Sequence, residues 1–201
     1  MSLEDQARWD ARYRKLADNS ILEPIALLRE NLHLLPREGR VVELACGMGA
    51  NIMLLAEQGL ECEGWDISPV AIDLLAAAAR ERGLSLQGVV RDLVAEPPQA
   101  EQFDVMIISR YLERSLFAAI AAALKPGGLL FYQTYTQQHV TGSGPFNSEF
   151  RLAPNELLRA FPALELIYYR EEGRVGDLDH GFRDEAELIA RKPLVNEHTA
   201  L

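Results

Sequence analysis

The stretch from Val41 to Gly59, VVELACGMGANIMLLAEQG, has the pattern of a short apolar strand, a glycine turn and the start of a helix. Glycines at 47 and 49 let the backbone of such a turn come close to a ligand, and the N-terminus of the helix adds partial positive charge. The place of a third glycine holds Ile52. In a dinucleotide site that glycine permits close packing of helix on strand, so a β-branched residue there argues against a bound pyrophosphate. A ligand with a carboxylate and no phosphate fits this turn better.

Strands and helices alternate along most of the chain, which predicts a parallel sheet covered on both faces. Two later strands, LELIYYREE and EAELIARKP, are joined by a loop without a helix, which predicts an antiparallel pair at one edge. The fold class is therefore α/β, a Rossmann-like, doubly wound, seven-stranded and mostly parallel sheet with an antiparallel C-terminal edge pair. The first five strands are predicted at Arg40–Ala45, Glu61–Ile67, Leu84–Asp92, Phe103–Ser109 and Leu129–Thr136.

Helix boundaries are indicated by local signals. Gly59 and Gly83 suit the C-terminal ends of two helices. Ser68 suits the N-cap of the second and Pro69 its first turn. The run from Lys125 to Gly128 is predicted to end a third helix.

Composition narrows the function. The 201-residue chain carries a net charge of -10, which would repel a phosphate backbone, so we expect no nucleic-acid partner. Two cysteines cannot make a disulfide framework, which favours a cytoplasmic setting. We expect no signal peptide and no membrane segment, because no apolar run is long enough for either. We expect no metal site, because the four histidines lack metal-ligand spacing. The expected partner is a small-molecule substrate, and the expected state is a monomer or homodimer.

The expected organisation is a single domain, 1–201. Within it, residues 1–35 form an N-terminal helical lid segment, residues 36–136 a cofactor-binding core, and residues 137–201 a substrate loop with the C-terminal strands.

Two aspartates follow strands at the same edge of the predicted sheet. Asp66 comes 17 residues after Gly49, and a carboxylate there can accept both hydroxyls of a ribose. The alternative is a solvated aspartate beside a plain turn. Asp92 ends the third strand, where its carboxylate can accept from an adenine amino group; the alternative is a helix-capping or loop aspartate.

The order and spacing of these features resemble those of a class I S-adenosylmethionine-dependent methyltransferase over residues 36–136. The resemblance rests on Glu43-x-x-Cys46-Gly47-x-Gly49, Asp66, Asp92, FDVMIIS and LKPGGLLFYQTY. The flanking segments are most similar to small tellurite-resistance and thiopurine methyltransferases. That likeness rests on Trp9-Asp10-x-Arg12-Tyr13 near the start, and on LAPNELLRAF and IYYREEGRV near the end.

The resemblance implies S-adenosyl-L-methionine as cofactor. It implies that Glu43 and the backbone of Ala45, Cys46, Gly47, Met48 and Gly49 hold the methionine moiety. It places Asp66 at the ribose, Ile67 on the adenine, Asp92 and Leu93 beside the adenine, and Ser109 and Arg110 beside the sulfonium. The family often has Asp where this chain has Glu43, and small or polar residues near Met48, so the pocket wall at Met48 is left open.

The acceptor side is expected among the C-terminal residues. His180, near Asp177 and Asp179, is a candidate base, with a surface-loop histidine as the alternative. His139 lies in a polar, glycine-rich stretch expected over the substrate pocket, with a mobile loop histidine as the alternative. Three arginines are candidates for binding an anionic substrate: Arg110, Arg151 and Arg183. The alternative for each is an ordinary solvent-exposed ion pair.

Trp9 and Tyr13 lie four residues apart on a helical pattern and so share one face. They are candidates for a lid over the cofactor, the alternative being a helix packed on the sheet edge.

We therefore expect methyl transfer from S-adenosylmethionine to a small-molecule acceptor, with a soft nucleophile such as a tellurite-like oxyanion or a thiol as the leading candidate. Two alternatives remain open. One is a non-catalytic S-adenosylmethionine binder. The other is a nicotinamide-dependent oxidoreductase, against which Ile52 and the lack of a hydride-transfer residue set argue.

Overall fold

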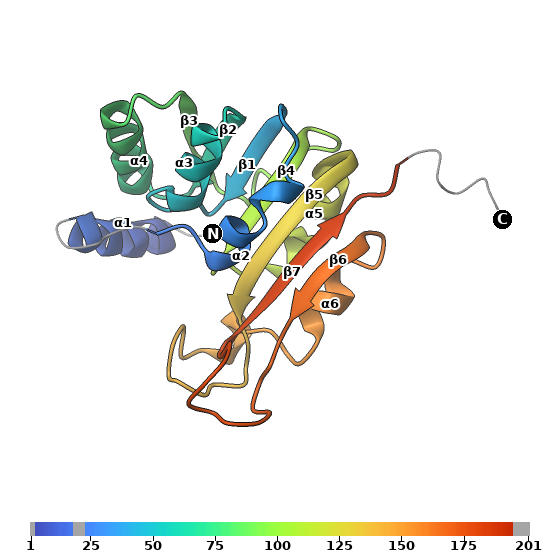
Figure 1. Ribbon diagram of the computed structural model, residues 1–201. Helices are drawn as coiled ribbons and strands as arrows, with labels where there is room; N and C mark the ends of the chain where they lie inside the picture. The colour runs from blue at the N-terminus through green and yellow to red at the C-terminus, as the bar shows by residue number, and fades with distance from the viewer. Residues whose placement is uncertain (1–2, 18–22, 195–201) are drawn as a thin grey trace.

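A seven-stranded sheet runs through the described part of the chain, residues 3–17 and 23–194 of the computed structural model (Figure 1). The strand order is β3-β2-β1-β4-β5-β7-β6. The first five strands of that order are parallel, and β7 pairs antiparallel with both β5 and β6. The predicted fold class is confirmed. The strands are β1 (Arg40–Leu44), β2 (Glu61–Asp66), β3 (Leu86–Val90), β4 (Phe103–Ser109), β5 (Leu124–Tyr135), β6 (Glu165–Arg170) and β7 (Glu185–Arg191).

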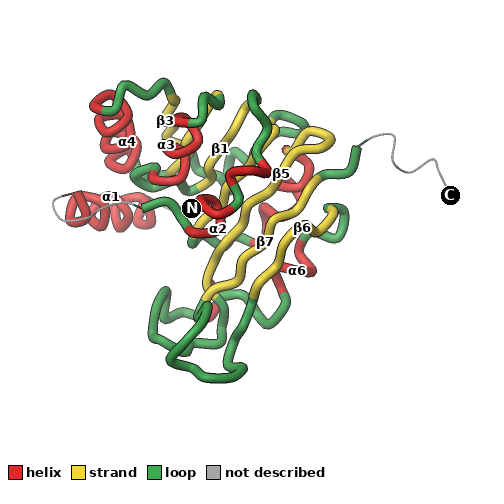
Figure 2. Tube along the Cα trace, viewed as in Figure 1, coloured by secondary structure: helices red, strands yellow, loops and turns green. Residues whose placement is uncertain are grey.

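Helices cover both faces of the sheet (Figure 2). Residues of α2, α3 and α4 pack into one apolar core, and residues of α5 and α6 pack into another on the opposite face. The central strand β4 contributes alternate residues to both cores, which explains its apolar sequence FDVMIIS. The helices are α1 (Leu3–Ala17), α2 (Ala26–Glu30), α3 (Ala50–Glu57), α4 (Pro69–Glu81), α5 (Phe117–Ala123) and α6 (Glu156–Ala160).

The helix signals read from the sequence are confirmed around α3 and α4. Ser68 caps α4, since its hydroxyl accepts from the Ala71 amide at 3.2 Å, and Pro69 opens the helix. Gly59, with a φ of +86°, follows the end of α3, and Gly83, with a φ of +66°, follows the end of α4. Left-handed backbone at these two places ends each helix and returns the chain to the sheet.

The start of β5 differs from the prediction. The structure begins the strand at Leu124, five residues before Leu129, because Leu124 pairs with Phe103 and the register then shifts before Val105 pairs with Leu129. The run from Lys125 to Gly128 was expected to end a helix and is instead an irregular strand entry, with Gly127 at a φ of +80°.

The N-terminal segment, expected as one helical lid, contains two helices with different surroundings. Helix α1 packs against α4. Helix α2 buries Leu27 and Leu28 in the core beneath the sheet. Helix α1 borders the edge of the sheet where a lid would act (Figure 1). Ile25, which precedes α2, also reaches this edge, because its N–H donates to the Asn51 side chain.

Gly49 is predicted to tolerate substitution less well than Gly59. Both have left-handed φ, so Ala costs about 1–2 kcal/mol of backbone strain at either position. A methyl group at Gly49 would also lie 2.2 Å from a Leu75 methyl carbon, whereas nothing lies within 4 Å of one at Gly59. Overpacking should therefore add about 1–3 kcal/mol to Gly49→Ala alone. Urea unfolding measures both, and equal losses would contradict the packing argument.

Candidate functional site

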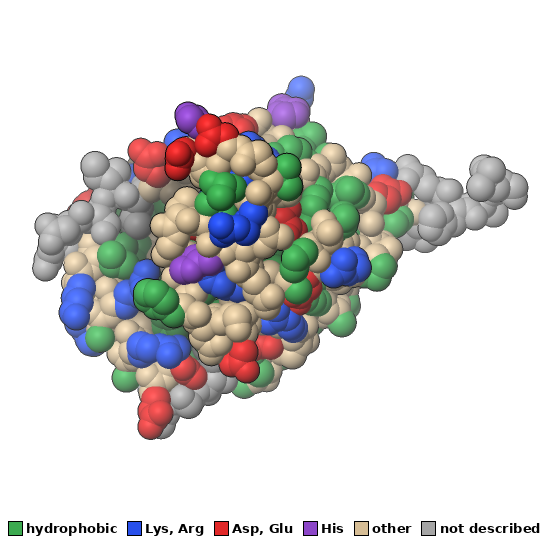
Figure 3. Space-filling model, turned by 90° about the horizontal axis from the view of Figure 1, so that it is seen from below, with side chains coloured by type: hydrophobic (Ala, Val, Ile, Leu, Met, Phe, Trp, Pro, Cys, Tyr) green, Lys and Arg blue, Asp and Glu red, His purple; other side chains and the backbone are tan. Residues whose placement is uncertain are grey.

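The candidate site lies at the C-terminal edge of the parallel strands. Strand order reverses between β1 and β4, so the chain leaves these two neighbours toward opposite sides and opens a crevice beyond their ends. Figure 3 views the molecule from this end, where basic and apolar side chains are interspersed. The glycine turn, Asp66 and the SRY segment after β4 all meet at this edge.

The glycine turn alternates between two backbone conformations. Ala45, Gly47 and Gly49 have φ values of +52°, +53° and +81°, and the residues between them have negative φ. Alternation of this kind makes a concave backbone whose N–H groups suit an anion such as a carboxylate. A methyl group at Gly47 would lie 3.1 Å from the Tyr13 hydroxyl, so the glycine keeps open the space between the turn and α1.

Glu43 anchors the turn from below. Its side chain is 1% exposed, and its two carboxylate oxygens accept from the Asn51 amide group at 2.6 Å and the Ile52 backbone N–H at 3.1 Å. Asn51 also donates to the Ser109 hydroxyl at 3.2 Å and accepts from the Ile25 backbone N–H at 2.9 Å. Burial raises the pKa of Glu43 to about 8, with the bonds from Asn51 and Ile52 opposing that rise. Glu43 thus ties β1, α3 and β4 together.

Asp66 joins three elements at the end of β2. One oxygen accepts from the Gly47 N–H at 2.9 Å and lies 3.4 Å from the Tyr13 hydroxyl, and the other accepts from the Ser68 N–H at 2.9 Å. The side chain is buried, and burial raises the pKa of Asp66, opposed by the bonds from Ser68 and Gly47. A carboxylate here can accept hydroxyl donors from a ligand in the crevice.

Helix α1 places two aromatic rings over the crevice. Trp9 and Tyr13 stack with their centroids 5.8 Å apart, which confirms that they share a face. Tyr13 contacts Asp66, and Asp10 of the same helix accepts from the Ser68 hydroxyl. Burial, and next the charge of Asp66, raises the pKa of Tyr13, so its hydroxyl remains a hydrogen-bond donor at neutral pH. The helix therefore covers the glycine turn through polar contacts with β2 and the start of α4.

The residues expected at the adenine differ in exposure. Leu93 is 1% exposed and packs in the core with Trp65, and Ile67 is partly exposed. The Asp92 carboxylate accepts from the backbone N–H groups of Val94 and Ala95. Asp92 therefore makes the contacts of a loop aspartate, which was the alternative to an adenine contact. Its side chain is partly exposed at the same edge.

Arg110 follows β4 in a left-handed conformation, with a φ of +54°. Its backbone N–H donates to the Gln133 carbonyl at 2.8 Å, and its guanidinium donates to the Glu185 carboxylate at 3.1 Å. Glu185 is itself mostly buried and also accepts from the Gln133 amide. Arg110 is therefore fixed at the ends of β4 and β5 with its charge paired.

The other candidate residues lie in two C-terminal loops. Arg151 and Arg183 donate to backbone carbonyl groups, Arg151 to those of residues 136, 143 and 145, and Arg183 to those of residues 173, 177 and 180. His139 is exposed and packs edge-on against Phe146, with ring centroids 6.5 Å apart. His180, 82% exposed in its side chain, bonds Asp177 at 2.9 Å.

Sequence reasoning missed three polar residues of this edge. Asn51 is 4% exposed in an otherwise apolar helix, which was the available signal for its bridging role. Gln133 is 5% exposed in an apolar strand, and its Oε1 has no hydrogen-bond partner among the described residues. The hydroxyl of Tyr111 is likewise buried without a partner there, and burial raises the pKa of Tyr111. Residues 3–17 and 23–194 hold no cluster of metal ligands and no helix long and apolar enough to cross a membrane.

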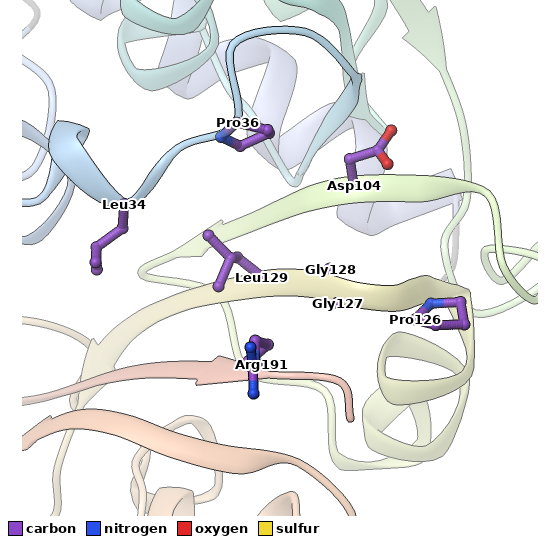
Figure 4. A pocket seen from close by; sticks show the side chains of 8 residues that line it. All are labelled: Leu34, Pro36, Asp104, Pro126, Gly127, Gly128, Leu129 and Arg191. Carbon is purple, nitrogen blue, oxygen red and sulfur yellow. The ribbon is translucent and has the colours of Figure 1, made fainter. Parts of the chain in front are cut away.

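A separate hollow of about 280 Å³ lies at the opposite, N-terminal edge of the parallel strands (Figure 4). Asp104 in its wall already accepts from the Arg40 N–H at 2.8 Å and the Lys125 ammonium at 2.6 Å. This hollow is remote from the glycine turn and is built around a satisfied structural carboxylate.

Residues 41–128, which hold the glycine turn, Asp66, Asp92 and β4, match the family model for a methyltransferase domain. Residues 41–128 are thereby identified as a methyltransferase domain. The cofactor that the sequence resemblance implies is S-adenosylmethionine. The alternating glycine turn and the Asp66 carboxylate offer the carboxylate-binding and hydroxyl-accepting groups that such a molecule requires.

Known relatives of this methyltransferase core differ in how much they share with the chain. A ubiquinone biosynthesis O-methyltransferase of Xanthomonas axonopodis pv. citri is 31% identical over 121 residues, which are 56% of this chain and half of the relative. A structure from work on the conversion of a disulfide bond into a thioacetal group in echinomycin biosynthesis has a TM-score of 0.71 at 20% identity, covering 96% of this chain and 94% of that one. TehB of Haemophilus influenzae has a TM-score of 0.68 at 19% identity, covering 92% and 67%. At such identities the two structures show a shared fold.

Burial of Glu43 predicts that the free energy of unfolding of the protein depends on pH. Because its folded-state pKa of about 8 lies above the ordinary 4.5, its contribution is complete below pH 4.5 and is lost as pH rises through 8. Glu43→Gln should therefore gain stability relative to the wild type between pH 5 and pH 8.5, by at most about 1.4 kcal/mol per pH unit. Urea unfolding at both pH values measures this, and a constant difference between the two proteins would contradict it.

Proposed function

We propose that this chain transfers the methyl group of S-adenosylmethionine to a small-molecule acceptor whose nucleophile is a thiolate or another soft atom. The observation that carries the proposal is the bond between the Asp66 carboxylate and the Gly47 N–H, 2.9 Å long, at the switch point of a methyltransferase core. It brings a hydroxyl-accepting group and the carboxylate-binding turn to one crevice. The chain spans about half to three-fifths of the length of the ubiquinone biosynthesis O-methyltransferases that it matches. The acceptors of those proteins are therefore not assigned to this chain.

On the cofactor side, each proposed role follows from a contact. Glu43 acts through Asn51 and Ile52 to hold the turn, whose backbone from Ala45 to Gly49 receives the methionine moiety. Asp66 accepts the ribose hydroxyls in place of the Tyr13 hydroxyl, which lies 3.4 Å away in this structure. Ile67, Asp92 and Leu93 form the adenine side.

When bound, the cofactor supplies a methyl carbon already activated by a sulfonium. The task of the protein is then to position the acceptor in line, which can supply about 7–11 kcal/mol of the barrier. A base is needed only for an acceptor that arrives protonated. Ser109 and Arg110 are proposed to lie beside the sulfonium, and Arg110 and His139 are the proposed groups on the acceptor side. Arg110 offers guanidinium N–H donors whose charge Glu185 balances, and His180 is the more remote candidate because it lies exposed beside Asp177.

The alternative of a non-catalytic binder shares the same cofactor contacts and differs only in the absence of methyl transfer to any acceptor. A nicotinamide-dependent oxidoreductase is disfavoured by the methyltransferase-domain match over residues 41–128.

Substitution of Asp66 is predicted to weaken cofactor binding. Asp66→Asn replaces one accepting oxygen with a donor, which leaves ribose hydroxyls badly paired, and should raise the Kd for S-adenosylhomocysteine more than about tenfold. Isothermal titration calorimetry measures this. Asp73→Asn, on the exposed face of α4, is the matched control and should bind as the wild type does. Undiminished affinity in Asp66→Asn, or stabilisation of the wild type by NADH and not by S-adenosylhomocysteine, would remove the basis of the proposal.

Methyl transfer itself is tested with S-adenosylmethionine labelled in its methyl group. The acceptor panel contains thiols, tellurite, primary amines and catechols. We expect labelled product from at least one thiol or from tellurite, since these need no base. Transfer to amines or catechols alone would overturn the soft-nucleophile part, and tight cofactor binding with no transfer to any acceptor would favour the non-catalytic binder.

A further inference from the structure

Arg151 is a buried cation whose guanidinium binds backbone carbonyl groups of its own loop. Its side chain is 3% exposed. Its guanidinium donates to the Thr136 carbonyl at 2.7 Å, to the Pro145 carbonyl at 2.6 Å and to the Ser143 carbonyl. Such a charge is costly to bury and persists where its hydrogen bonds are complete.

Asp184 grips the same loop from the other side. It is 1% exposed and stands just before β7 with a φ of +63°. Its carboxylate accepts from the N–H and hydroxyl of Thr141 and from the N–H groups of Val140 and Ser143. Arg151 therefore binds three carbonyl groups between residues 136 and 145, and Asp184 binds three N–H groups between residues 140 and 143. The segment gains a fixed shape without belonging to a strand or helix.

The gripped segment lies over the acceptor end of the crevice. The Arg151 guanidinium carbon is 5.5 Å from the centre of the Tyr135 ring, and a methyl group at Gly144 would lie 2.5 Å from that ring. Tyr135 pairs across the sheet with Glu185, which holds Arg110 at 3.1 Å. The loop thus rests on the C-terminal end of β5, beside the segment that follows β4.

Exposed groups project from this fixed loop. Phe146 is 95% exposed and makes an edge contact with His139. The loop is also joined to the segment between β6 and β7, because the Arg174 N–H donates to the Gln138 side chain at 2.9 Å (Figure 1). Phe146 and His139 thus present two aromatic rings side by side on this loop.

We propose that Arg151 and Asp184 are positioning residues that hold residues 136–151 as a preformed wall of the acceptor site, and that Phe146 and His139 on this wall contact an apolar or aromatic part of the acceptor. The inference rests on the proposed methyl transfer. It reassigns Arg151 from substrate binding to the construction of the wall, and it names an aromatic surface as the determinant of acceptor choice.

The positioning role is tested by hydrogen–deuterium exchange in Arg151→Met and Asp184→Asn. Asn keeps the hydrogen-bonding shape and tolerates the left-handed backbone, so it covers the case in which Arg151→Met fails to fold. Arg159→Met is the matched control, because Arg159 is exposed and donates to one carbonyl, that of Pro154. Amides of residues 137–147 should exchange about tenfold faster in the two test variants and unchanged in the control. Affinity for S-adenosylhomocysteine should stay within about twofold of the wild type.

Acceptor contact is tested with Phe146→Ala, whose exposed side chain has no part in folding. The probes are thiophenol, which carries an aromatic ring, and 2-mercaptoethanol, which does not. We expect the KM for thiophenol to rise about tenfold in Phe146→Ala, with kcat and the KM for S-adenosylmethionine unchanged and 2-mercaptoethanol unaffected.

Several outcomes would overturn the inference. Unchanged exchange in both test variants would show that the loop does not need these charges. A loss of S-adenosylhomocysteine affinity as large as that in Asp66→Asn would make the loop part of the cofactor wall. Equal effects of Phe146→Ala on both thiols would remove the apolar contact. If the wild type methylates neither thiol, that result counts against the proposed function. The positioning role of Arg151 and Asp184 is then still tested by hydrogen–deuterium exchange and by the affinity for S-adenosylhomocysteine.

Discussion

The carboxylate of Asp66 is the contact on which the arrangement of the site depends. It receives N–H groups from the glycine turn and from the start of α4, and it lies beside the Tyr13 hydroxyl of α1. Three separate elements are therefore registered on one side chain at the end of β2. Because the carboxylate is buried, leaving these donors unpaired would be costly, so the turn, the helix and the lid are held in one geometry. The proposed function assigns the same oxygens to a ribose, so the Tyr13 hydroxyl and a bound ligand would compete for one acceptor.

The cofactor side and the acceptor side are built by different means. On the cofactor side, the order of parallel strands brings Glu43, Asp66 and the glycine turn to one edge, and Asn51 links them to β4. On the proposed acceptor side, residues 137–147 lie outside the described strands and helices. Two buried charges, Arg151 and Asp184, shape the loop by hydrogen bonds to its backbone. A site built partly on a sheet edge and partly on a loop is the division expected of a fold that serves many reactions.

The sequence was sufficient to predict the sheet, its antiparallel edge and the position of the glycine turn, because these follow from periodicity and from glycine chemistry. It also located the Ser68 cap and the Gly59 and Gly83 helix ends. The start of β5 escaped it, since the strand entry at Leu124 depends on pairing with Phe103 and overrides the turn-like LKPG. The arginines escaped it for a related reason. Arg151 and Arg183 looked free to bind an anion, but their partners are backbone carbonyl groups, which carry no residue-specific signal in the sequence.

The most direct test of the account is a crystal structure of the chain with S-adenosylhomocysteine bound. We expect the ribose hydroxyls to bind Asp66, with the Tyr13 hydroxyl displaced from it. We expect the carboxylate of the ligand to lie over the turn from Ala45 to Gly49. We also expect the sulfur to face a space bounded by Arg110, Tyr135 and the loop that carries Phe146. A ligand whose ribose lies away from Asp66, or whose sulfur points to a wall made by other residues, would contradict the account.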